Sequence, residues 1–193
     1  MIRGSRYIDD LIIFLTYKNI QTKSLAKAII QTIEQHTYHK FMQLKKEDTS
    51  KTFSFLEGLI TIIKNTLQGD TIDIQYNNKN YQPLMTNGDL KYLTLQHRHS
   101  FITPQQAISK IIGQFCRMAR TVNSPLNLIK ATFEFIIIAK HLQYKDHEIK
   151  QAILKMCHKN IYQHTWTQIH NLFSMYRINT ESLFFQLALK TYS

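Results

Sequence analysis

Two adjacent carboxylates near the start of the chain carry its clearest chemical signal. Asp9 and Asp10 lie between two apolar, β-forming runs, at residues 7–8 and 11–14. Carboxylate oxygens are the hard ligands that Mg²⁺ prefers, and two such ions stabilise the attacking and leaving oxygens in phosphoryl transfer. Because neighbouring carboxylates repel one another, a nearby cation would favour this arrangement. A solvated, Asp-rich turn is the alternative interpretation.

The elements that must position these carboxylates follow from the local pattern. Residues 1–16 are predicted to form a β-hairpin with Asp9 and Asp10 in its turn. A helix is expected from Ser24 to His39, because Leu25 and further apolar residues recur at helical spacing. Additional strands are expected at residues 41–44, 53–63 and 71–76, followed by a polar loop at 77–103.

From residue 104 onward the apolar pattern has the helical period. Thr103 and Pro104 are typical of a helix start, with Thr103 as the N-cap. Later helices are expected from Ser124-Pro125 to about Leu142, from an Asp146 cap to about His158, and near Thr165–Tyr176 and Thr180–Thr191. The predicted fold class is therefore α+β, with a mixed domain at residues 1–100 and an all-helical bundle at 101–193.

The charge balance points to a polyanionic partner. The net charge is +11 in 193 residues, and a domain this basic most often meets nucleic acid. Lys110, Arg117 and Arg120 share the first long helix of the bundle, and the forked donors of Arg suit phosphate oxygens. These three residues are candidate nucleic-acid contacts; an ordinary basic outer face is the alternative.

The remaining residue types predict few other sites. Cys116 and Cys157 have no metal-binding or paired spacing, which predicts two free thiols in a reducing intracellular compartment, an organelle included. His97 and His99 are interpreted as loop residues. The longest clean apolar run is far shorter than a membrane helix needs, so no membrane partner is expected. The aromatic residues expected in the core are Phe133, Phe135, Trp166, Phe173, Tyr176, Phe184 and Phe185.

The order of these features resembles the C-terminal part of the reverse transcriptases of Penelope-like retroelements. In that family a double-Asp hairpin is followed by a helix and an F-L-D-x-x-I strand. Residues 6–10 and 55–60 are similar, although Glu57 stands where Asp is usual. The segment Tyr81-Gln82-Pro83 occupies the place of the family's Y-R-K-P.

Two later segments extend the resemblance into the thumb. Arg117 and Arg120 are similar to the family's late R-x-x-R, in a segment that begins at His99-Ser100. Leu142 to Tyr144, followed by Ile149 and Ala152, resembles an L-x-x-G-Y…I-x-x-A helix pair, with Gln143 where Gly is usual.

The resemblance implies a partial polymerase palm at residues 1–100 and a thumb-like bundle at 101–193. Asp9 would be the direct metal ligand and Asp10 its supporting carboxylate, with Mg²⁺ as the cofactor if the chain is catalytic and none otherwise. Tyr7 would lie near the primer end, with Lys110, Arg117 and Arg120 on the nucleic acid. We expect no counterpart among residues 1–193 of the family's fingers or of its upstream palm strand, which carries another metal-binding Asp.

The implied function is that of a palm–thumb segment that binds RNA or an RNA–DNA hybrid. It could be the C-terminal piece of a split RNA-directed DNA polymerase, active only when complemented by the upstream segments. A protein partner or ribonucleoprotein is expected to cover the open edge of the incomplete sheet. The alternatives are a non-catalytic RNA-binding component of a ribonucleoprotein, such as an organellar ribosome, and a decayed retroelement remnant.

Overall fold

The chain combines strands and helices in two compact units, Met1–Leu56 and Glu57–Ser193. The computed structural model describes residues 2–7, 10–15, 24–25, 27–29, 31–32, 51–64, 69–159 and 161–175. Mixed helix and strand content confirms the predicted α+β class at this level. The palm and thumb identities remain predictions.

The first unit begins with the predicted hairpin. Strands β1 (Ile2–Tyr7) and β2 (Asp10–Leu15) pair antiparallel, in a register that sets Tyr7 opposite Asp10. Asp10 is thus the first residue of a strand, whereas a turn position was predicted. Strand β3 (Thr52–Phe55) ends this unit.

The predicted helix from Ser24 is seen in part. Residues 24–25, 27–29 and 31–32 are helical, and Thr32 Oγ1 donates to the Ala28 carbonyl at 3.0 Å. Leu25, expected on a buried apolar stripe, is 60 % exposed. The rest of this helix and the strand predicted at 41–44 lie outside the described residues.

The second unit starts with a hairpin of β4 (Gly58–Ile63) and β5 (Thr71–Tyr76), paired from Gly58–Tyr76 to Ile63–Thr71. The prediction of one continuous strand at 53–63 is wrong. Leu56 has a φ of 54°, the left-handed region that no extended strand adopts, and the chain turns there. The prediction of the strand at 71–76 is confirmed.

A short helix, α2 (Tyr81–Asn87), lies inside the segment predicted as loop. It ends at Gly88, whose φ of 75° suits a residue without a Cβ. Leu84 is the buried side chain of this helix, and α2 packs against α4. A helix of seven residues with one buried side chain is too short to show a repeating apolar pattern, so the sequence does not indicate it.

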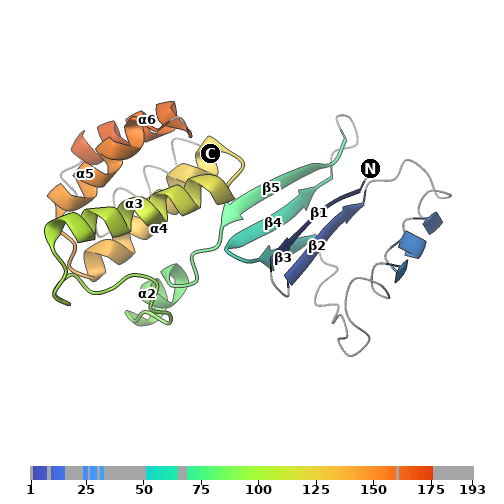
Figure 1. Ribbon diagram of the computed structural model, residues 1–193, viewed down its shortest axis with the longest axis horizontal. Helices are drawn as coiled ribbons and strands as arrows, with labels where there is room; N and C mark the ends of the chain where they lie inside the picture. Colours follow the sequence, from blue (N-terminus) through green and yellow to red (C-terminus); the bar gives the residue numbers. More distant parts are fainter. Residues whose placement is uncertain are drawn as a thin grey trace. The chain divides into compact units, whose positions relative to one another are not determined.

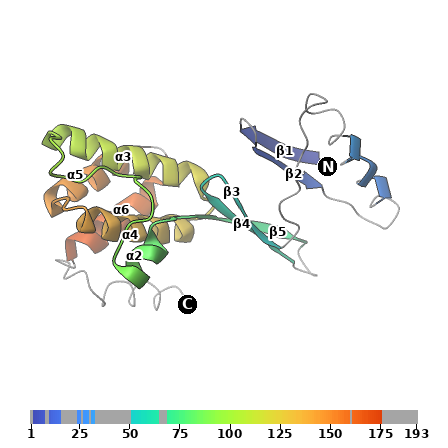
Figure 2. The same cartoon turned by 90° about the horizontal axis from the view of Figure 1, so that it is seen from below.

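Four longer helices follow, and they lie together in Figures 1 and 2: α3 (Pro104–Thr121), α4 (Pro125–His141), α5 (Asp146–Cys157) and α6 (Gln163–Met175). The start of α3 is as predicted: Gln106 N donates to Thr103 Oγ1 at 3.3 Å, and Thr103 N donates to Gln106 Oε1 at 3.0 Å. The prediction of Asp146 as an N-cap is wrong, because Lys145 holds that position. The helix expected near 180–191 lies outside the described residues.

The core of this unit is aromatic at its centre. The Phe115 ring lies 5.0 Å from that of Trp166 and 5.5 Å from that of Phe135, and both Phe115 and Trp166 are fully buried. Phe133 and Phe173 are also buried, which confirms the four described aromatics of the predicted core. The same cluster includes two residues from before α3, Leu84 and Leu95. Residues 81–102 therefore belong with the helices, whereas a boundary near residue 100 was predicted.

Asparagine side chains cover the outer edge of β5. Asn123 Oδ1 accepts a hydrogen bond from Ile74 N at 2.9 Å, and its Nδ2 donates to the Ile72 carbonyl at 2.6 Å, as a neighbouring strand would. Asn127 Nδ2 donates to the Ile74 carbonyl at 3.0 Å and to Asp73 Oδ1 at 2.7 Å. The open edge expected for this sheet is therefore already occupied at Ile72 and Ile74.

Among the described residues, no helix has the length and apolar character that crossing a bilayer requires. Cys116 and Cys157 are free thiols, as predicted.

Candidate nucleic-acid interface

Carboxylates are nearly absent from the surface of the helical part. Residues 90–175 contain eleven Lys and Arg against three acidic residues, and none of the three falls between 90 and 133. Glu148 is fully buried and Glu134 is 7 % exposed. Asp146 alone is exposed, and it contacts the Lys140 ammonium. An anion approaching residues 90–175 therefore meets few carboxylates of that segment, although Glu57 of the hairpin lies beside Arg117.

Helix α3 presents the three predicted basic residues on its outer side. Its buried positions run from Ala107 to Ala119, and Lys110, Arg117 and Arg120 lie opposite them at 3.6 residues per turn. The Arg117 side chain is 56 % exposed and Arg120 is exposed. Lys110 is half-buried, with its Nζ donating to Gln96 Oε1. The three residues therefore lie on one side of α3, and their contact with nucleic acid stays a prediction.

Arg117 has a partner that sequence reasoning missed. Its NH1 donates to Glu57 Oε1 at 2.8 Å, across sixty residues of chain. Tyr76 adjoins this pair: burial first, and the Glu57 charge second, raise the pKa of its hydroxyl to about 12. The pair joins the start of the hairpin to the outer side of α3. No local pattern indicates such a contact.

The acidic hairpin is described only in part. Tyr7 and Asp10 are paired residues at its closing end, and Asp9 lies outside the described residues. Within the described parts of the chain, no three His, Cys, Asp or Glu side chains come together to hold a metal ion. The Mg²⁺ site at Asp9 and Asp10 stays a prediction, because Asp9 lies outside the described residues.

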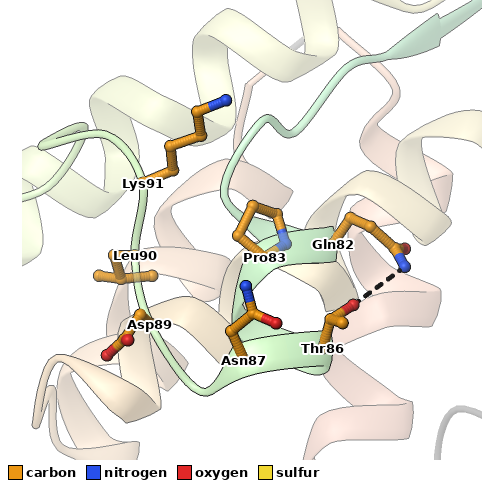
Figure 3. A pocket seen from close by; sticks show the side chains of 7 residues that line it. All are labelled: Gln82, Pro83, Thr86, Asn87, Asp89, Leu90 and Lys91. Atoms are coloured by element: carbon orange, nitrogen blue, oxygen red, sulfur yellow. Dashed lines mark hydrogen bonds between the residues drawn. The ribbon is translucent and has the colours of Figure 1, made fainter.

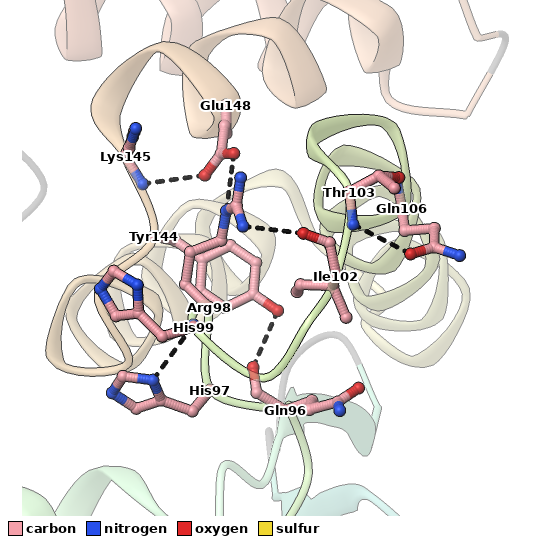
Figure 4. A network of polar contacts seen from close by, with 10 residues as sticks. All are labelled: Gln96, His97, Arg98, His99, Ile102, Thr103, Gln106, Tyr144, Lys145 and Glu148. Carbon is pink, nitrogen blue, oxygen red and sulfur yellow. Dashed lines mark hydrogen bonds and ion pairs between the residues drawn. The ribbon is translucent and has the colours of Figure 1, made fainter.

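A polar network fixes the segment that precedes α3, as Figure 4 shows. Arg98 Nε donates to Glu148 Oε1 at 2.8 Å, and its NH1 donates to the Ile102 carbonyl at 2.9 Å. The Tyr144 hydroxyl donates to the Gln96 carbonyl at 2.9 Å. Both ends of residues 96–102 are thereby tied to the start of α5.

The histidines beside Arg98 take no part in that anchor. His97 and His99 are exposed, with ring centroids 5.5 Å apart, and His99 N donates to His97 Nδ1 at 3.3 Å. Their interpretation as loop residues agrees with this placement.

A hollow of about 520 Å³ lies beside α2 (Figure 3). Gln82 Nε2 donates to Thr86 Oγ1 at 3.3 Å on one wall, and Asp89 and Lys91 stand on the other. The hollow carries charges of both signs and no buried polar group. It therefore lacks the single-sign character of the α3 surface.

Comparison of the chain with models of protein families, with curated proteins and with solved structures finds no match. Function must therefore be argued from the site itself.

Proposed function

We propose that this chain is a reverse-transcriptase-derived palm–thumb segment that binds RNA or an RNA–DNA hybrid through the outer side of α3. The observation that carries the proposal is the surface of residues 90–175, where Asp146 is the one exposed carboxylate among eleven cationic side chains. Lys110, Arg117 and Arg120 would contact phosphates, and the sequence of the nucleic acid would matter little.

Two features of the fold support the resemblance behind this proposal. Gln143, which stands where the family has Gly, has a φ of 67°, a backbone conformation that Gly adopts at least cost. Glu57 and Arg117, which the resemblance assigns to two separate motifs, form an ion pair. Motif residues that lie far apart in sequence thus meet in space.

The test measures the binding of an RNA–DNA hybrid to the full chain. Fluorescence anisotropy monitors the binding at a series of salt concentrations. Replacing both Arg117 and Arg120 with Ala should reduce the slope of log K against log salt by about 2, because two phosphate contacts are lost. Lys150 and Lys155 are exposed on α5, so the K150A/K155A variant is the charge-matched control and should keep the slope. Equal slopes for the two variants would refute a specific role of α3.

The same preparation separates binding from catalysis. Primer extension with Mg²⁺ would be measured for the wild type and for Asp9→Ala, on the same hybrid. Incorporation that depends on Asp9 would support a contribution of the hairpin to a metal site. Hybrid binding with no incorporation by either protein would favour the non-catalytic RNA-binding role.

A further inference from the structure

A second hollow lies where the anchored segment enters α3. It has a volume of about 640 Å³ and is broadly open to solvent. Its lining contains amides, hydroxyls, one aromatic ring and one cation, and no carboxylate: Gln96, Ser100, Phe101, Ile102, Gln105, Gln106, Ser109 and Lys110. Lys110 belongs both to this hollow and to the outer side of α3, so the two surfaces are continuous.

Phe101 is placed in a way that packing does not explain. The residue is fully exposed, with a relative exposure of 105 %, beside the buried core of the same unit. Its φ of 50° lies in the left-handed region, which is an outlier for a bulky residue. An aromatic ring held in water by a strained backbone gains nothing from folding, and such outliers gather at ligand sites.

The position of Phe101 is set by contacts on both sides. Arg98 NH1 donates to the carbonyl of Ile102, the next residue, and Arg98 N donates to the Leu142 carbonyl at 3.0 Å. Beyond it, the side chains of Thr103 and Gln106 cap α3. The ring therefore stands on an ordered turn before any ligand arrives, which reduces the entropy lost on binding.

Polar groups suited to a base surround the ring. No hydrogen bond joins the side chain of Gln105 or Ser109 to another described residue, and both side chains carry a donor and an acceptor. Amides of this kind can pair with the edge of a nucleobase. Lys110 supplies a cation for the adjoining phosphate.

We propose that this hollow binds one unpaired nucleotide of an RNA, with its base stacked on Phe101 and its phosphate near Lys110. The inference rests on the proposed function, because the outer side of α3 would hold the paired region next to that nucleotide. The chain would then recognise the junction between a hybrid and a single strand. Base–aromatic stacking tolerates any base, so no sequence preference is expected.

The test compares a blunt RNA–DNA hybrid with the same hybrid carrying two unpaired RNA nucleotides, each titrated with the full-length protein at one salt concentration. We expect the extension to strengthen binding about tenfold, the effect of stacking one base. Phe101→Ala should remove that gain and leave the affinity for the blunt hybrid unchanged. Phe101→Trp should keep it, since Trp offers a larger ring.

Leu93 provides the matched control. It is 97 % exposed in the connection between α2 and α3 and does not line the hollow, so Leu93→Ala should retain the gain. A fluorescent purine analogue at the first unpaired position should lose emission on binding to the wild type and keep it with Phe101→Ala. A gain that persists in Phe101→Ala, or a wild type that binds both hybrids equally, would overturn the inference alone. A wild type that binds neither hybrid would overturn the proposed function as well.

Discussion

Two arginine–glutamate ion pairs in the second unit have the same 2.8 Å separation and very different surroundings. The Arg98 and Glu148 side chains are 13 % and 0 % exposed, whereas those of Arg117 and Glu57 are 56 % and 37 % exposed. The first pair ties the segment before α3 to α5, and the second links the β4–β5 hairpin to the outer side of α3.

The difference lies in what water can do at each place. A buried charge that loses its partner remains desolvated, so removing one member of the Arg98–Glu148 pair should strongly destabilise the fold. Glu148 Oε2 also accepts from Lys145 N at 3.1 Å, which leaves both of its oxygens satisfied. An exposed pair exchanges its partner for water or for another anion at little cost. Although the two distances are equal, the Arg98–Glu148 pair anchors the segment before α3, whereas the Arg117–Glu57 pair is a contact that can be replaced.

The largest expected effect comes from Glu148→Gln, which keeps the shape of the side chain and removes its charge. Because Arg98 would be left buried without a counter-charge, the free energy of unfolding should fall by about 3–5 kcal/mol. Denaturant unfolding measures this change, and Glu57→Gln in the exposed pair is the matched control. A loss below about 1 kcal/mol would show that Glu148 is not an anchor.

A third glutamate sharpens the comparison, because Glu134 is buried with no ion-pair partner among the described residues. Burial raises its pKa from the ordinary 4.5 to about 7, against the opposing influence of Lys130. The folded chain therefore binds this proton more tightly than the unfolded chain does. The resulting stability is complete below about pH 4.5 and is lost as pH rises to about 7.

Glu134→Gln should consequently stabilise the protein where Glu148→Gln destabilises it. At pH 8 the gain in unfolding free energy should be about 1–3 kcal/mol, and it should vanish below pH 4.5, where the wild-type carboxyl is protonated as well. Thermal unfolding across this pH range measures the difference. A destabilised variant at pH 8 would mean that the Glu134 carboxylate has a partner that compensates its charge.

Local signals were sufficient for strand β5 and for most of the helices. The Thr103 N-cap before Pro104, the alternation of residues 71–76 and the apolar period of α3 each depend on residues a few positions apart. Where a tertiary contact decides, the sequence indicated the wrong structure. Lys145 takes the cap from Asp146 because Glu148, already held by Arg98, accepts its amide.

In the candidate site, too, some features could be predicted from the sequence and others could not. Lys110, Arg117 and Arg120 were predictable as one face, since their spacing alone fixes it. The partner of Arg117 was not, because Glu57 lies sixty residues away in sequence. Phe101 was not either, because the residue types around it indicate neither its exposure nor the positive sign of its φ.

The smallest expected change in stability comes from the exposed pair, and it is the one that bears on function. Glu57→Gln should alter the free energy of unfolding by less than about 1 kcal/mol, because Arg117 remains in water. A phosphate then no longer competes with Glu57 for the guanidinium, so affinity for an RNA–DNA hybrid should rise by about 1.5- to 5-fold. Anisotropy titrations of Glu57→Gln and Arg117→Ala with the same hybrid measure the expected rise in affinity for the first variant and the expected fall for the second. If the two variants shift the affinity in the same direction, Arg117 does not contact the nucleic acid, and the exposed pair is structural after all.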